Sequence, residues 1–184
     1  MRKLIESNHV SLGGEIGSPQ EWAAEYLNDE HMQYANELLF SADALLLGRK
    51  TYEGLSKAYP SMDRSEFGKF GGFVDRMNSI PKYVASTTLK KAIWNATIIP
   101  GDVGTFVSDL KRQPGLNIVK YGNGSLDDIL LTSNLIDEYH FLLTPAAVGR
   151  GKHLFEDVQT PPHLTLVDVK RFTNGVVLLI YTPK

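Results

Sequence analysis

Two short runs that are typical of β-strands stop at glycine in this chain, and each leads directly into residues that suit a helix start. The run ALLL ends at Gly48, which precedes Arg49, Lys50 and Thr51, and the run NIVKY ends at Gly122. A buried strand followed at once by a helix is the repeating unit of parallel sheets. These two junctions therefore predict an open α/β sheet rather than an all-helical or all-β domain.

The segments around the junctions alternate in the same way along the chain. Further strands are expected at 3–10, 82–86, 96–100 and 138–145, and helices at 28–42, 50–58, 66–79, 102–113 and 125–134. Residues 163–183 contain two alternating runs that meet at Asn174-Gly175, which predicts a hairpin closed by a type I′ turn. We expect a single domain over 1–184 with an α/β/α three-layer arrangement and a mostly parallel sheet with an antiparallel C-terminal hairpin.

Charge and composition exclude several classes of function. The 184 residues carry a net charge of −2, whereas domains that bind nucleic acid through bulk electrostatics are usually basic. Cysteine is absent, and the five histidines show no metal-ligand spacing, so we expect no metal site and no disulfide. The N-terminal residues lack the apolar stretch of a signal peptide and no run is long enough to span a membrane, so we expect a cytoplasmic protein.

The residues at the strand ends suit phosphate groups. Glycine lets the backbone approach a ligand closely, the first turn of a helix offers free N–H groups, and Arg49 can bind a phosphate through two parallel hydrogen bonds. A third predicted strand end supplies Ser86, Thr87 and Thr88. Ordinary turns, solvated charges and helix caps would also explain these residues, and neither G-x-G-x-x-G nor the phosphate-loop pattern is present. Taken together, the three strand ends suggest a site for a phosphorylated dinucleotide.

Four segments carry a resemblance to a known family: RKLIESNHVSLGGEIG, ADALLLGRKTYEG, KYVASTTL and YGNGSLDDILLTSNLIDEYHFLLTPAAVGRGKHLF. They resemble the dihydrofolate reductase superfamily, and most closely the reductase (C-terminal) domain of bifunctional riboflavin-biosynthesis deaminase/reductase proteins. The resemblance implies a dihydrofolate-reductase-like fold and NADPH-dependent hydride transfer to a small heterocycle. The implied substrate is of the 5-amino-6-(5-phosphoribosylamino)uracil type or pteridine-like. Related reductases, together with the very apolar last strands, also imply a homodimer.

The resemblance also assigns roles to residues by position. Arg49 would favour the 2′-phosphate of NADPH, and Val10 and the loop 11–17 would border the nicotinamide. The residues implied to bind the cofactor are Gly17, Gly48, Arg49, Lys50, Thr51, Ser86, Thr87, Gly122, Asn123, Gly124, Ser125 and Leu126.

The substrate side of the implied site departs from its relatives. Gly13 stands where relatives often have aspartate, Asn123 stands where a third glycine is common, and Leu27 stands where folate reductases have a carboxylate. We therefore do not expect true dihydrofolate reductase activity. The candidate substrate-binding residues are Val10, Trp22, Tyr52 and Tyr59, with Asp29 as the candidate catalytic carboxylate; helix packing and the helix dipole would also explain Tyr52, Tyr59 and Asp29.

Two alternatives to this reductase stay open from the sequence. One is a non-catalytic module that binds NADP(H), which the altered loop and missing carboxylate favour. The other is a nitro- or quinone-type reductase with broad substrate choice.

Overall fold

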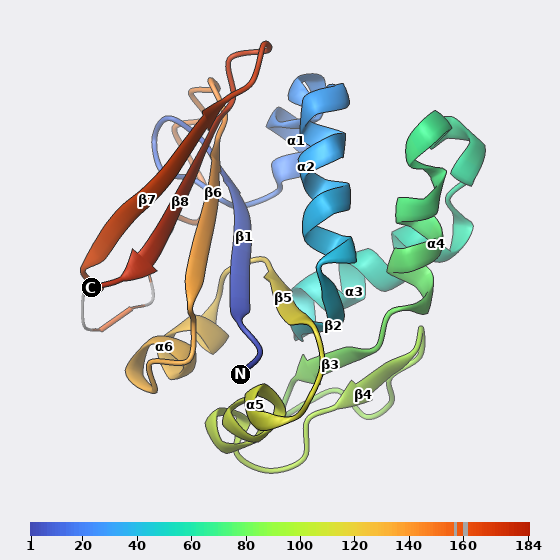
Figure 1. Ribbon diagram of the computed structural model, residues 1–184, viewed down its shortest axis with the longest axis vertical. Helices are drawn as coiled ribbons and strands as arrows, with labels where there is room; N and C mark the ends of the chain where they lie inside the picture. The colour runs from blue at the N-terminus through green and yellow to red at the C-terminus, as the bar shows by residue number, and fades with distance from the viewer. Residues whose placement is uncertain (157, 160–161) are drawn as a thin grey trace.

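The computed structural model describes residues 1–156, 158–159 and 162–184 and consists of one eight-stranded sheet with helices on both faces (Figure 1). In chain order, the elements are β1 Leu4–Val10, α1 Pro19–Trp22, η1 Ala24–Tyr26, α2 Asp29–Phe40, β2 Ala42–Gly48, α3 Arg49–Ala58, η2 Tyr59–Ser61, η3 Arg64–Phe70, α4 Gly71–Ser79, β3 Lys82–Ala85, β4 Ala96–Ile98, α5 Val103–Arg112, β5 Asn117–Tyr121, α6 Ser125–Thr132, β6 Glu138–Leu143, β7 Leu164–Arg171 and β8 Val177–Pro183. Within the described part of the chain, no helix has the length and apolar character to cross a membrane.

The strand order explains the connections between the elements. The order is β4-β3-β2-β5-β1-β6-β8-β7, and the first six strands run parallel to one another. Strand β8 lies antiparallel between β6 and β7. Parallel neighbours need crossover helices, whereas β7 and β8 are joined by a tight turn. The expected mostly parallel sheet with a C-terminal hairpin is confirmed.

The carboxyl ends of the central strands meet at one edge of the sheet. Tyr121, the last residue of β5, is in register with Leu47 of β2 on one side and with Ser7 of β1 on the other. Gly48 in turn is in register with Ala85 of β3. The segments that leave β2, β3 and β5 therefore start next to one another.

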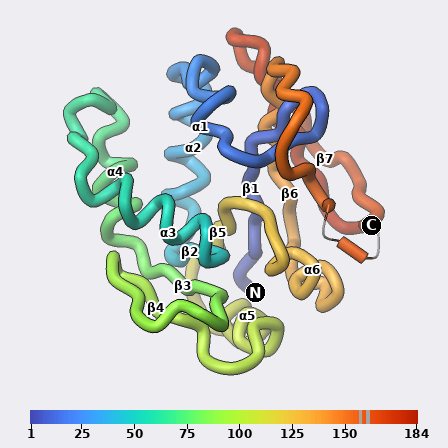
Figure 2. Tube along the Cα trace, turned by 180° about the vertical axis from the view of Figure 1, so that it is seen from behind, coloured from blue at the N-terminus to red at the C-terminus, as the bar shows by residue number. Residues whose placement is uncertain are grey.

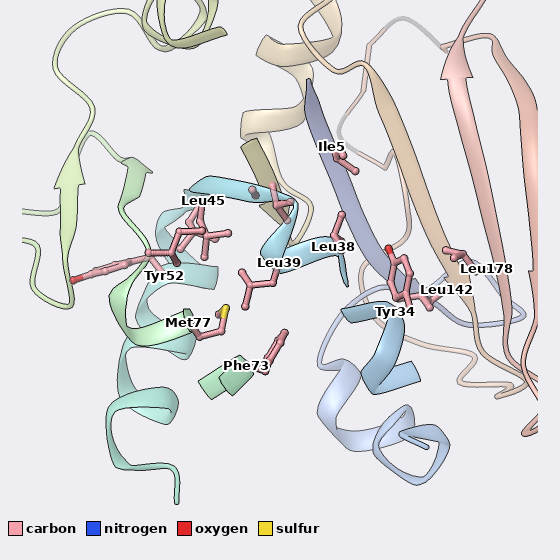
Figure 3. Close-up of a cluster of buried hydrophobic side chains, with 14 of the residues drawn as sticks. Ile5, Tyr34, Leu38, Leu39, Leu45, Tyr52, Phe73, Met77, Leu142 and Leu178 are labelled. Carbon is pink, nitrogen blue, oxygen red and sulfur yellow. The ribbon is translucent and has the colours of Figure 1, made fainter. Parts of the chain in front are cut away.

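Alternating side chains divide the interior into two cores. Leu45 and Leu47 of β2 belong to the core that packs against α2, α3 and α4, part of which Figure 3 shows. Ala44 and Leu46 belong to the core on the opposite face, which packs against α5 and α6. Figure 2 shows the molecule from behind, with α5 and α6 labelled. A strand that is buried on both faces needs apolar residues without interruption, as in ALLL. The expected three layers are present.

Helices α2 and α5 each begin directly after a residue whose side chain caps the first turn. The side chains of Asn28 and Asp102 accept hydrogen bonds from the backbone N–H groups of His31 and Thr105, which caps α2 and α5. The single helix expected over 66–79 is wrong in its first half. Gly68 has φ +50° and ψ −123°, which kinks the chain within the 3₁₀ segment η3, and the α-helix α4 begins only at Gly71.

The turn between β7 and β8 differs from the expected type. A type I′ turn needs positive φ at both central residues, but only Gly175 has a positive φ, of +90°. Gly175 N–H donates to Phe172 O at 3.1 Å, so Thr173 and Asn174 are the central residues. Asn174 Oδ1 accepts from Val176 N–H at 3.1 Å. The Asn-Gly pair therefore sits one position later in the turn than predicted, with glycine at the left-handed position that follows it.

Candidate functional site

The two glycine junctions lie in contact at the carboxyl edge of the sheet. Gly122 follows β5 with φ +75°, and a Cβ atom at this position would overlap Thr51 Oγ1 in the first turn of α3. Figures 1 and 2 both show the start of α3 beside the end of β5. Glycine at 122 is therefore required by the backbone and by the close approach of α3.

Gly48 and Gly124, the neighbouring glycines, are not required by the backbone or by packing in the same way. Gly48 has φ −74° and ψ +159°, a conformation open to any residue, and a Cβ atom there would meet nothing within 4 Å. Gly124 has an extended φ of 176°, and its Cβ would meet only Lys152 Nζ, at 3.9 Å. Neither the chain's own packing nor its conformation requires these two glycines, so both leave clear space that a closely bound group could occupy.

A helix begins directly after each glycine junction. Helix α3 begins at Arg49 with no side chain capping its first N–H groups. Helix α6 begins at Ser125, where the Gly124 N–H donates to the Asp127 carboxylate. Leu126 packs into the α5–α6 core while Ser125 is exposed. The partial positive charges of the α3 and α6 N-termini thus face the same edge, an arrangement that attracts anions.

Arg49 connects this edge to the segment that follows β3. Its guanidinium donates to Thr88 Oγ1 at 2.5 Å and to Glu53 Oε1 at 2.7 Å. Ser86 Oγ accepts from the backbone N–H groups of Thr88 and Leu89, so it orders this loop. Thr87 lies between Ser86 and Thr88 and is exposed, and Lys50 is exposed as well. Three predicted strand ends are thereby brought together.

The loop after β1 packs against a second loop far along the chain. Gly14 O accepts from Leu154 N–H at 2.9 Å, and Ile16 N–H donates to Lys152 O at 2.8 Å. Gly17 approaches the backbone of the same lysine, since a Cβ atom on Gly17 would lie 3.4 Å from Lys152 N. These contacts place the Lys152 ammonium beside Gly124. No local motif marks Lys152 as a site residue, because the residues around Gly151-Lys152 do not match the phosphate-loop pattern and only the fold brings this lysine to the edge.

Two of the expected substrate-side residues lie at the end of β1. Val10 is buried, and its carbonyl accepts from Thr144 N–H at 2.8 Å. Trp22 is half-buried, and its indole Nε1–H donates to Gly17 O at 2.8 Å. The ring of Trp22 is therefore fixed to the end of the loop 11–17.

Three other expected residues are engaged in different contacts. The Tyr52 side chain is only 3% exposed, and its hydroxyl donates to Ile93 O and accepts from Ile93 N–H. Tyr59 stacks on Trp94 with ring centres 6.0 Å apart, and burial raises its pKa to about 12. The Asp29 side chain is 79% exposed and pairs with Lys69 Nζ at 2.6 Å. Tyr52 and Tyr59 thus stabilise the α3 side of the core, and Asp29 faces solvent.

The α2 side of the strand ends contains polar groups that the sequence analysis treated as structural or did not single out. His9 and His31 stack with ring centres 4.9 Å apart, and each has a buried Nδ1 without a hydrogen-bond partner. Burial lowers the pKa of both rings to about 4, so they are neutral at pH 7. The Tyr121 hydroxyl is also buried and unpartnered, one residue before Gly122. No sequence pattern marked these residues, because strand order alone brings β1, β5 and α2 together.

Comparison with known proteins assigns the chain to a family. The model for the RibD C-terminal domain matches residues 2–178. YyaP of Bacillus subtilis (strain 168), a protein described as uncharacterized, is 29% identical over 180 residues, which cover 98% of this chain and 94% of YyaP.

Solved structures show the same fold. A chain from Shewanella sp. PV-4 superposes with a TM-score of 0.77 at 19% identity, covering 99% of both chains. A Thermotoga maritima diaminohydroxyphosphoribosylaminopyrimidine deaminase/5-amino-6-(5-phosphoribosylamino)uracil reductase gives 0.67 at 16% identity, covering 100% of this chain and 57% of that one. A dihydrofolate reductase from Enterococcus faecalis complexed with NADP(H) gives 0.64 at 13% identity, covering 99% and 96%.

Proposed function

The chain belongs to the RibD C-terminal domain family, and we propose that it is a reductase that transfers hydride from NADPH to a small heterocycle. The observation that carries this proposal is the pair of adjoining glycine turns at the carboxyl edge, where no packing contact among the described residues accounts for the absence of a side chain at Gly48 and Gly124. Ligands of open α/β sheets bind beyond the carboxyl ends of the strands.

The cofactor would lie along this edge. The N–H groups at the start of α3, with Lys50 and Thr51, and those of Gly122 to Leu126 at the start of α6 would bind its phosphates. Arg49, together with Ser86 and Thr87, would bind the adenosine end and its 2′-phosphate. We add Lys152 to this set because its ammonium lies beside Gly124.

The substrate would lie between the loop 11–17 and the α2 side of the strand ends. When bound, NADPH supplies the hydride, and the chain must orient the acceptor and exclude water. Val10 would border the nicotinamide and Trp22 would cover the ring of the substrate. The substrate class we propose is an aminouracil of the 5-amino-6-(5-phosphoribosylamino)uracil type, which the name of the Thermotoga maritima protein contains, or a pteridine-like heterocycle. We leave Tyr52, Tyr59 and Asp29 out of the proposed site because their contacts lie elsewhere.

One observation favours the second candidate, a module that binds NADP(H) without turnover. All three carboxylates of α2 already have partners within the fold: Asp29 pairs with Lys69, Glu30 accepts from Thr173 in the β7–β8 turn, and Glu37 accepts from Gln33. None of them is left unpaired to orient a substrate or supply a proton.

Two measurements on the full chain decide between these candidates. Quenching of Trp fluorescence during titration with NADPH tests the cofactor site before any substrate is chosen. Loss of NADPH absorbance with a panel of aminouracils, pteridines, quinones and nitro compounds then tests turnover and its breadth. Binding without turnover would favour the module, turnover across the panel would favour the broad reductase, and absence of NADPH binding would overturn the proposal.

We also propose that the protein forms a homodimer through β7. This strand is at the edge of the sheet and exposes Leu166, Val167 and Val169, each about half accessible. Exposed apolar edge strands pair readily with another strand. Sedimentation velocity would show a dimer that Val167→Lys converts to a monomer; a monomeric wild type would contradict this arrangement.

A further inference from the structure

Three charged side chains lie fully buried beneath the second glycine turn. Glu6 of β1, Lys120 of β5 and Asp127 of α6 are each at most 1% exposed. Lys120 Nζ lies 3.2 Å from Glu6 Oε2 and also contacts Asp127 Oδ1. We call these three residues the buried triad.

The buried triad contacts every residue of the turn from Gly122 to Gly124. Lys120 Nζ donates to Gly122 O at 2.5 Å, and Asn123 Nδ2 donates to Glu6 Oε1 at 3.3 Å. The Gly124 N–H donates to the Asp127 carboxylate. Hydrogen bonds to three ionisable side chains, each on a different element, therefore hold the turn in its conformation.

The charges of the buried triad do not balance. Two carboxylates face one ammonium, so the ionised triad carries a net negative charge directly under the turn. Glu6 Oε2 and Asp127 Oδ1 receive no directed hydrogen bond, although Lys120 lies close to both. A proton on Glu6, which lies within hydrogen-bonding reach of Asp127, would leave the triad neutral.

The surroundings of Glu6 favour this proton. Burial, with a smaller contribution from Asp127, raises the pKa of Glu6 to about 8, against the opposing effect of Lys120. Asn8, on the same strand as Glu6, donates to Glu6 Oε1 at 2.7 Å. On the neighbouring strand β6, burial and then the charges of Glu6 and Asp127 raise the pKa of Tyr139. Lys152 from the loop before β7 brings its ammonium beside Gly124, on the turn that the triad supports.

We propose that the buried triad positions the Gly122–Gly124 turn for an anionic dinucleotide and takes up a proton at Glu6 when that ligand binds. This inference rests on the proposed NADPH site. A pyrophosphate above the turn would repel an ionised Glu6, which favours the protonated triad. By linkage, dinucleotide affinity then falls as the pH rises through the range in which Glu6 ionises. Glu6 and Lys120 act as positioning residues, since the ligand would touch the turn and not the triad.

Calorimetry tests the proton uptake. NADPH is titrated into the wild type at a pH near 8, in two buffers of different ionisation enthalpy, and the difference in binding heat gives the number of protons taken up. We expect a substantial fraction of a proton for the wild type and none for Glu6→Gln, which keeps the acceptor for Asn8. The matched control is Glu37→Gln, which removes a carboxylate on the exposed side of α2 and should behave as the wild type.

A second measurement needs no cofactor. The amide NMR signals of Gly122 and Gly124 in the free protein should shift together with pH in the wild type and stay fixed in Glu6→Gln. NADPH binding without Glu6-dependent proton uptake, and glycine signals that do not titrate, would overturn the inference while leaving the proposed function intact. Titrating glycine signals in a protein that fails to bind NADPH would instead overturn the proposed function and support the coupling of Glu6 to the turn.

Discussion

Thr51 and Gly122 meet across the junction of two helices and two strands, close enough that a Cβ atom on Gly122 would overlap the threonine hydroxyl. The two residues are 71 positions apart in the chain, counted as 122 minus 51. Their contact brings the first turn of α3 and the turn before α6 to one place, and the proposed cofactor site depends on it.

Gly122→Ala should destabilise the protein, because alanine is strained at φ +75° and must also displace Thr51. We expect a loss of about 1–3 kcal/mol in the free energy of unfolding, measured by urea denaturation. The control is Gly54→Ala in α3, where the new methyl group meets nothing within 4 Å. That variant should gain about 0.5–1 kcal/mol. Equal stability of the two variants would contradict the close contact.

Gly124→Val should separate binding from folding. The backbone at this position is extended and the only described atom within 4 Å of the new Cβ is Lys152 Nζ, so the midpoint of thermal unfolding should change little. A branched side chain there would occupy the space proposed for the pyrophosphate, and we expect NADPH affinity to fall at least about tenfold, or about 1.4 kcal/mol. Retained affinity in a normally folded variant would remove this turn from the proposed site.

The sequence was sufficient for features that depend on neighbouring residues. Asn28 and Asp102 cap helices because a short polar side chain just before a helical run satisfies its free N–H groups. The strand ends at Gly48 and Gly122 were recognisable for a similar local reason, and parallel strands place such ends at one edge.

Features that depend on strand order were not predictable in this way. Glu6 and Asn8 look like the solvent-facing residues of an alternating strand, yet β1 lies in the middle of the sheet and α6 covers that face. The partner of Glu6 is Lys120, on a strand whose position next to β1 no local pattern reveals. The stacking of His9 on His31 was hidden for the same reason.

Arg49→Ala should weaken the binding of NADPH much more than the binding of NADH, because the Arg49 guanidinium is expected to bind the 2′-phosphate that NADH lacks. We expect NADPH affinity to fall about 10- to 100-fold and NADH affinity to stay within about twofold, measured by fluorescence titration. The matched control is Arg64→Ala, an exposed arginine paired with Asp75 in another part of the surface. Equal losses for both dinucleotides would contradict the assignment of Arg49.

His31→Phe should reduce the loss of stability in acid. In the folded protein burial lowers the pKa of His31 to about 4 from an ordinary value of 6.5, so below pH 6.5 the unfolded chain binds a proton that the folded chain does not. Stability is therefore fully present above pH 6.5 and is lost as the pH falls to about 4, by roughly 3 kcal/mol for such a shift. Urea denaturation across this range should show a shallower decline for the variant. The exposed His163→Phe is the control, and parallel curves for all three proteins would contradict a buried neutral ring.

Tyr121→Phe should keep or increase stability while raising the KM for the heterocycle. The hydroxyl it removes is buried without a hydrogen-bond partner, so the folded protein loses no bond, and we expect a change between zero and about 1 kcal/mol in favour of folding. Tyr121 packs against the core on the α2 side, immediately before the proposed pyrophosphate turn, and we predict that a heterocycle bound beside the nicotinamide reaches this buried hydroxyl. We therefore expect a higher KM for the heterocycle at unchanged NADPH affinity. The matched control is Tyr52→Phe, which loses two hydrogen bonds to Ile93 and should cost about 1 kcal/mol or more without changing KM. If Tyr121→Phe is destabilised as much as Tyr52→Phe, the Tyr121 hydroxyl has a partner within the fold and does not serve the substrate.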